Sequence, residues 1–158
     1  MLKQEFIKQY LFPAQKAGEC FGINPIVILA QSAIETGWGE STLAKEHHNF
    51  FGITATDVQT LSGKAQRPIF LKQRPYLLMV PHLRISGRQF YGLRPSDHTA
   101  YPVAASLSPH PSAYAKEIAY SKYISEVNGD NRAAYQRMLV SICRTIERLI
   151  INHNFQLT

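Results

Sequence analysis

The sequence contains few cysteines and no long apolar run. Its 158 residues include only two cysteines, Cys20 and Cys143, which are too few and too far apart for a disulfide framework or a four-cysteine zinc site. The count leaves open whether the two thiols pair. No segment is long and apolar enough to cross a membrane, and no internal repeat or low-complexity tract is present. We therefore expect one compact domain over residues 1–158.

Long runs of one charge are also absent, although the chain is basic. Its 17 Lys and Arg residues outnumber 11 Asp and Glu residues, which gives a net charge of +6 and a pI of about 9.4. This charge attracts polyanions such as nucleic acid, anionic lipid or a carboxylate-rich bacterial cell wall. The basic residues are scattered, however, and no basic stripe or RNA-binding aromatic motif is present. We therefore expect no nucleic acid and no membrane partner.

Hydrophobic periodicity divides the chain into three regions. Residues 2–54 are helical in pattern, residues 55–96 are rich in proline and β-favouring runs, and residues 97–154 are helical again. The middle region predicts short strands or a hairpin at an edge or on a protruding lobe.

Two helices are predicted in the last region. The first covers residues 114–124, and the second covers residues 131–151 with Asp130 or Asn131 as its cap. The proline-flanked stretch 102–111 is predicted to be a loop.

One helix in the first region is apolar on most sides. Gly22 ends the preceding helical segment, and Asn24-Pro25 begins a new one with a capping residue and a proline in the first turn. Residues 26–34 are nearly all apolar or small, so this helix is expected to be buried on most sides. Gly37 then ends it.

Glu35, at the end of this apolar helix, is the candidate for acid chemistry. A glutamate in the last turn of a helix is usually a solvated surface residue, but few solvated glutamates follow nine mostly apolar residues. Desolvation and the negative end of the helix dipole both disfavour the carboxylate form, and Trp38 would add an apolar wall. A glycosidase needs such a proton donor for the departing oxygen of the sugar bond.

Metal and thiol chemistry are weakly indicated. His47-His48 with Asp97 and His98 lack the spacing of a zinc motif. The two cysteines lie on patterned helices and are expected to be buried apolar residues instead of nucleophiles. We therefore expect no metal and no cofactor.

Two motifs around Glu35 resemble a known family. Residues 22–41 read GINPIVILAQSAIETGWGES, and residues 49–53 read NFFGI. In this order and at this spacing they resemble the signature of glycoside hydrolase family 73, which holds bacterial N-acetylglucosaminidases that cleave peptidoglycan. The resemblance is dense over residues 5–54, and a weaker likeness lies in the tyrosine-rich segment 114–123.

The resemblance implies a lysozyme-like α+β fold, mainly helical, with a small β-lobe and a substrate groove between the lobes. Glu35 takes the general-acid position, and peptidoglycan is the substrate. The residues that would bind the glycan are Trp38, Asn49, Phe50, Gly52 and Tyr91.

The sequence leaves open which group acts as the second catalytic residue. Family members often carry another acidic residue in the β-lobe, but residues 47–116 contain only Asp57 and Asp97. Asp57 is the candidate for a remote base, whereas Asp97 has the setting of a helix cap. Alternatively, the N-acetyl oxygen of the substrate attacks the sugar and a tyrosine stabilises the charge. The candidate tyrosines are Tyr91, Tyr101 and Tyr114.

The leading hypothesis is an endo-β-N-acetylglucosaminidase, and the alternatives are a muramidase or lytic transglycosylase, for example a phage endolysin, and an inactive wall-binding domain. Residues 1–10 lack the apolar core of an export signal. We therefore expect a protein made in the cytoplasm that acts in the periplasm or wall of a target bacterium. Delivery by a type VI secretion machine would fit, with a cognate immunity protein that occludes the groove.

Overall fold

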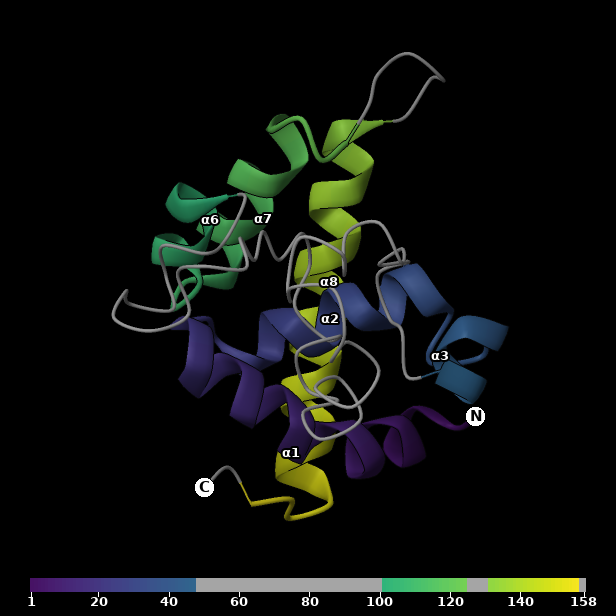
Figure 1. Ribbon diagram of the computed structural model, residues 1–158. Coiled ribbons are helices and arrows are strands. Elements are labelled where there is room, and N and C mark those ends of the chain that lie inside the picture. The colour runs from purple at the N-terminus through teal and green to yellow at the C-terminus, as the bar shows by residue number, and fades with distance from the viewer. Residues whose placement is uncertain (48–100, 125–130, 157–158) are drawn as a thin grey trace, which may run out of the picture.

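The protein is described by a computed structural model over residues 1–47, 101–124 and 131–156 (Figure 1). In these ranges the chain is helical and contains no strand. The helices are α1 (Lys3–Phe21), α2 (Pro25–Thr36), α3 (Thr42–His47), α6 (Pro102–Leu107), α7 (Pro111–Tyr120) and α8 (Arg132–Asn152). The predicted helical part of the fold is therefore confirmed, while the predicted β-lobe lies outside the described residues. No helix within the described ranges has the length and apolar character needed to span a membrane.

The boundary between α1 and α2 has the predicted helix-ending glycine and the predicted capping residue. Gly22 follows α1 in the left-handed conformation, with φ of 65°, and its N–H donates to the Gly18 carbonyl. The Asn24 side chain then accepts a hydrogen bond from the Ile26 N–H at 2.9 Å, ahead of a proline at the first position of α2. Gly37 ends α2 in the same left-handed conformation.

Gly18 allows α1 and the chain before α2 to approach closely. A Cβ atom added at this position would lie 2.5 Å from the Ile23 carbonyl oxygen and 3.2 Å from the Pro25 ring. Because a carbonyl oxygen of the backbone cannot move aside cheaply, only glycine fits here without a shift of one of the two segments.

Two predictions for the region after residue 100 were wrong in detail. Residues 102–111, predicted as a loop, contain α6, and α7 covers Pro111–Tyr120 instead of 114–124. Each helix has a proline at its start. At that position the missing N–H costs nothing and the fixed φ of proline suits a helix, so these prolines initiate helices instead of breaking them.

Helix α8 begins after Asn131, whose side chain accepts a hydrogen bond from the Ala134 N–H at 2.9 Å. Of the two predicted caps, Asn131 is therefore the one used. The buried side of α8 carries Tyr135, Leu139, Cys143, Ile146 and Ile150.

The core is organised around α2 and α8. Helix α2 packs against α1, α7 and α8, while α8 packs in addition against α7, and α6 packs against α7 (Figure 1). Every residue of α2 from Ile26 to Ala33 is buried, which confirms the predicted burial of this helix. The residues that contribute the largest fully buried side chains are Phe6, Ile7, Phe21, Ile28, Leu29, Gln31, Ile118, Leu139 and Ile146.

Candidate functional site

Glu35 lies in the last turn of α2, at the margin of the helical core. Burial of the helix ends here, because Ile34 is half-buried and Glu35 is exposed. The prediction that the apolar helix would bury this carboxylate was therefore wrong within the described part of the chain. The physical reason is that Glu35 lies on the side of the last turn that the neighbouring helices leave uncovered, whereas Ala33 and Thr36 of the same turn are buried. An exposed carboxylate is accessible to a substrate.

Tyr123 contacts Glu35 directly. The Tyr123 hydroxyl donates a hydrogen bond to Glu35 Oε1 at 2.5 Å, although the two residues are 88 positions apart in the sequence. Tyr123 lies in the turn that follows α7, and its ring packs edge-on against Tyr101 at 6.1 Å between centroids. This hydrogen bond fixes the position of the Glu35 carboxyl group relative to the turn after α7.

Arg132 holds the turn that carries Tyr123. Its guanidinium donates to the carbonyl oxygens of Tyr120 at 3.3 Å and Ile124 at 3.2 Å, on either side of the turn. The Ser121 side chain closes the same turn, since it donates to the Ile118 carbonyl at 2.7 Å and accepts from the Tyr123 N–H at 3.1 Å. The backbone of Tyr123 is thus anchored to both α7 and α8.

A chain of polar side chains continues from Tyr123 into the core. The Tyr123 ring packs against the Tyr135 ring at 6.0 Å between centroids, and the Tyr135 hydroxyl accepts from Gln31 Nε2 at 3.4 Å. The Tyr114 hydroxyl in turn donates to Gln31 Oε1. We refer to Tyr114, Gln31, Tyr135, Tyr123 and Glu35 as the polar chain.

The tyrosines of this chain keep their protons. Burial raises the pKa of Tyr135 to about 12. Burial also raises the pKa of Tyr123 well above its ordinary value, and the neighbouring Tyr135 and the Glu35 carboxylate add to the shift. The pKa of Tyr114 is raised mainly by burial as well. All three hydroxyls are therefore donors at neutral pH.

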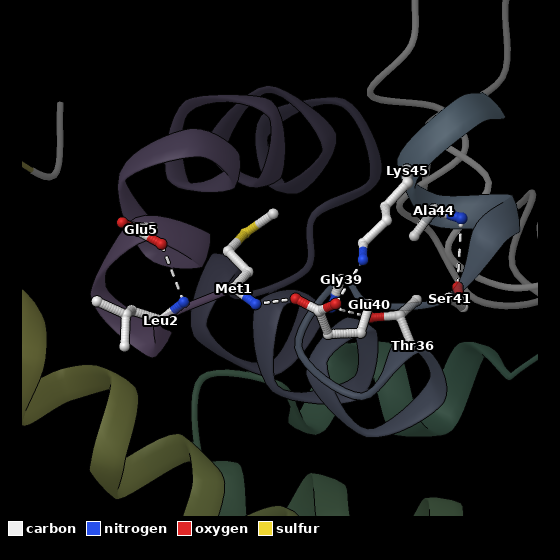
Figure 2. Close-up of polar contacts among 9 residues, drawn as sticks. All are labelled: Met1, Leu2, Glu5, Thr36, Gly39, Glu40, Ser41, Ala44 and Lys45. Atoms are coloured by element: carbon white, nitrogen blue, oxygen red, sulfur yellow. Dashed lines mark hydrogen bonds and ion pairs between the residues drawn. The ribbon is translucent and has the colours of Figure 1, made fainter.

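The Gly-Trp-Gly turn, residues 37–39, follows Glu35 and reverses the chain. All three residues have positive φ, at 57°, 62° and 79°, a conformation that costs energy for a residue with a large side chain such as Trp38. Thr36 holds the turn, because its hydroxyl accepts from the Gly39 N–H at 2.8 Å and donates to the Ser32 carbonyl at 2.6 Å. Figure 2 shows Thr36 and Gly39 next to Glu40, whose carboxylate pairs with Lys45.

Trp38 packs toward α1 from this turn. Its ring meets Phe6 edge-on at 5.5 Å between centroids, and Lys3 Nζ lies 5.1 Å from the centre of the Trp38 ring. These contacts explain how the strained residue is held. A role for Trp38 as a wall beside the Glu35 carboxylate stays a prediction.

The other predicted site residues have different outcomes. Tyr114 is buried, and its hydroxyl donates to Gln31 Oε1; its role in stabilising the charge on the sugar stays a prediction. Tyr101 supports the Tyr123 ring. The remaining predicted residues, which lie outside the described ranges, are Asn49, Phe50, Gly52, Asp57 and Tyr91.

Tyr123 is the residue that sequence reasoning missed. It belonged to the tyrosine-rich segment of the resemblance, but its contact with α2 depends on the turn after α7, which no periodicity reveals. Within the described ranges no cluster of three or more potential metal ligands occurs, and both cysteines are free thiols. The described site is a carboxylic acid that accepts a hydrogen bond from one phenol, Tyr123, and such an acid suits proton transfer to an oxygen.

The comparison with known families decides the broader assignment. A family model described as mannosyl-glycoprotein endo-beta-N-acetylglucosaminidase matches residues 12–148, which is most of the chain. The chain belongs to this glucosaminidase family. Membership makes it a glycoside hydrolase by family and confirms the family assignment that the motifs around Glu35 predicted.

Several relatives resemble a short part of the chain. A protein of Streptococcus pneumoniae assigned as an endo-beta-N-acetylglucosaminidase is 51% identical over 43 residues, which cover 27% of this chain and 6% of the relative. The peptidoglycan hydrolase FlgJ of Pseudomonas aeruginosa is 45% identical over 53 residues, 31% of this chain and 13% of FlgJ. FlgJ of Salmonella typhimurium is 37% identical over 57 residues, which cover 34% of this chain and 18% of that FlgJ. The chain thus spans less than a fifth of the length of these relatives.

Proposed function

We propose that the chain hydrolyses the glycan strand of peptidoglycan as an endo-β-N-acetylglucosaminidase, with Glu35 as general acid. The observation that carries the proposal is the exposed Glu35 carboxylate with the Tyr123 hydroxyl on its Oε1 atom. The family match over residues 12–148 and the relatives named as peptidoglycan hydrolases support the substrate class. A lysozyme-like arrangement, in which a second lobe faces Glu35 across a groove, is part of the proposal.

In this mechanism Glu35 gives its proton to the glycosidic oxygen while the bond from that oxygen to the sugar carbon breaks. The electron pair of the bond stays on the departing oxygen, and positive charge develops on the ring. Tyr123 remains protonated and donates to the carboxylate that Glu35 becomes, so the product form of the acid is stabilised as it forms.

The group that completes the reaction differs between two routes. In one, Asp57 activates water from a distance, and in the other the N-acetyl oxygen of the substrate attacks the sugar carbon. Asp57→Asn separates them. An unchanged rate indicates attack by the N-acetyl group, and a loss of about 10² to 10⁴ indicates a protein base.

The products released from purified peptidoglycan test the bond that is cleaved. Muropeptides are analysed by mass before and after chemical reduction, which labels the free reducing sugar. We expect reducible N-acetylglucosamine ends. Reducible N-acetylmuramic acid ends would show a muramidase, and ends that cannot be reduced would show a lytic transglycosylase. The absence of any released fragment, from enzyme whose fold is verified, would contradict hydrolysis of peptidoglycan.

Delivery as an injected effector with an immunity protein remains a separate hypothesis, to which the matched relatives give no support. It predicts lysis when the chain is routed to the periplasm, no harm when the chain stays in the cytoplasm, and rescue by the product of the neighbouring gene. Lysis that this product does not relieve would count against an immunity partner.

A further inference from the structure

The outer face of α8 carries a row of arginines. Arg137, Arg144 and Arg148 are all exposed, and their spacing of seven and four residues places them within about 40° of one another around the helix axis. Buried residues of α8, among them Leu139 and Ile146, lie on the opposite side of the helix. The row therefore points away from the core, and it extends for about 16 Å along α8.

This arginine row is not apparent in the linear sequence, which contains no long basic run. A regular helix brings together residues that are three, four or seven positions apart, so charges that are separated in the sequence share one surface. The expectation that the positive charge is scattered was therefore wrong for α8. The helix contains four arginines and one acidic residue, Glu147, which lies about 80° around the axis from the row.

The arginine row has no acidic partner within the described part of the chain. The ion pairs found there involve α1, the N-terminus, the turn after α2 and α3, and none of them involves α8. The fourth arginine of α8, Arg132, differs from the row because it holds the turn after α7. The three guanidinium groups of the row are thus accessible to an anion outside the molecule.

We propose that the arginine row is a second contact surface, which binds carboxylates on the peptides of the cell wall and holds the enzyme on its polymer. A guanidinium binds a carboxylate through two parallel hydrogen bonds. One exposed ion pair contributes little, but a polymer that carries many carboxylates engages several arginines at once. The choice of peptidoglycan as the partner rests on the proposed function, whereas binding by the row needs no catalysis.

The place of the row separates it from the groove proposed beside Glu35. Helix α8 packs on α2 through its buried side (Figure 1), so the row faces away from the helix that carries Glu35. The wall segment that the row binds is therefore distant from the sugar bond that is cleaved. We expect the row to affect retention on the insoluble wall and not the chemical step.

The first experiment measures cosedimentation with purified insoluble peptidoglycan, with Glu35→Gln in every protein so that the polymer stays intact. Arg144→Gln/Arg148→Gln, the row variant, removes two charges and keeps side chains that favour a helix. The matched control is Lys8→Gln/Lys116→Gln, which removes the same charge from exposed positions on α1 and α7. An effect of net charge alone is therefore equal in the two variants.

We expect the row variant to bind about 3- to 10-fold more weakly than the parent protein at low salt, as the loss of two exposed ion pairs would predict. The control should bind within about twofold of the parent. The difference should disappear at high salt, because screening weakens exposed pairs, and on peptidoglycan whose carboxylates have been converted to amides.

Equal binding of the row variant and the control to native peptidoglycan would overturn the proposal. A loss that persists on the amidated polymer would also overturn it, since carboxylates would then not be the ligand. If the row variant loses binding only to DNA or to anionic lipid vesicles, the row serves another polyanion and the proposal is wrong. Circular dichroism verifies the fold, and Arg137→Gln, which should weaken binding less, provides a second variant.

The second experiment measures hydrolysis by the same variants with Glu35 in place. We expect the row variant to raise the apparent KM on insoluble peptidoglycan about 3- to 10-fold with kcat unchanged, and to match the control on short soluble glycan fragments. An equal loss on both substrates would overturn a role in retention. An inactive wild-type enzyme would contradict the proposed function alone, because cosedimentation would still test the row.

Discussion

The two ends of the polar chain differ in exposure and in what they contribute. At the inner end, Gln31 and Tyr114 are buried, and the Tyr114 hydroxyl donates a hydrogen bond to Gln31 Oε1. At the outer end, the Glu35 carboxylate is exposed and Tyr123 is half-buried. A buried polar group must be satisfied for the fold to be stable, whereas an exposed one is free to exchange partners with a substrate. Substitutions at the inner end should therefore lower stability, and substitutions at the outer end should lower activity.

Apart from substitution of Glu35 itself, the largest effect is expected from breaking the outer end at Tyr123. Tyr123→Phe keeps the ring contacts with Tyr101 and Tyr135 and removes the donor on Glu35. We expect the rate of peptidoglycan clearing to fall about 10- to 100-fold, the cost of a hydrogen bond to a charged group. Tyr120→Phe, which alters an exposed ring at the end of α7, just before the turn that carries Tyr123, is the control. Equal rates in both variants would show that the Tyr123 hydroxyl is not used.

A substitution that affects only the packing of the core tests whether the core and the site around Glu35 are independent. Gly18→Ala places a Cβ atom 2.5 Å from the Ile23 carbonyl oxygen, so the junction of α1 and α2 must shift. We expect the free energy of unfolding to fall by about 1–3 kcal/mol, measured by urea denaturation, with the rate of the folded enzyme retained. A stability equal to that of wild type would mean that the two segments separate easily. A large loss of rate in fully folded enzyme would contradict the independence of core and site.

A smaller stability effect is expected at the start of α8. Asn131→Ala removes the side chain that accepts from the Ala134 N–H, and loss of such a cap costs about 1 kcal/mol. The midpoint of urea unfolding measures it. Asn131→Asp, which keeps an acceptor and adds a charge favourable at a helix N-terminus, should restore stability.

The smallest effect concerns the reactivity of Cys143. Burial raises the pKa of this thiol to about 12, so almost no thiolate exists at pH 8, and the folded protein should not react with iodoacetamide at this position. The thiolate fraction rises only as the pH approaches that value. Mass analysis of protein labelled before and after denaturation checks this. Labelling of Cys143 in the folded state would show that the core opens around α8.

Much of the first half of the site was predictable from local sequence. The apolar run, the Asn24-Pro25 start and the Gly37 end define α2, and they place Glu35 in its last turn. These signals work because caps and helix periodicity act over a few residues. The exposure of Glu35 was not predictable in this way, since it depends on where the neighbouring helices end.

The second half of the site depends on contacts between distant segments. The prolines before α6 and α7 initiate helices, although proline alone does not distinguish a helix start from a loop. The choice of Tyr123 over Tyr114 depends on the turn that Arg132 and Ser121 hold. No spacing rule reports such tertiary contacts. The contacts that place Tyr123 next to Glu35 form only when α2, α7 and α8 pack together.

The most direct test of the central claim is the rate of peptidoglycan hydrolysis by Glu35→Gln. The amide keeps the size of the side chain and an oxygen that can accept from Tyr123, but it has no acidic proton to give. We expect a folded protein, with the circular dichroism and unfolding midpoint of wild type, whose rate is lower by about 10² to 10⁴. A rate close to that of wild type in the same assay would show that Glu35 is not the proton donor.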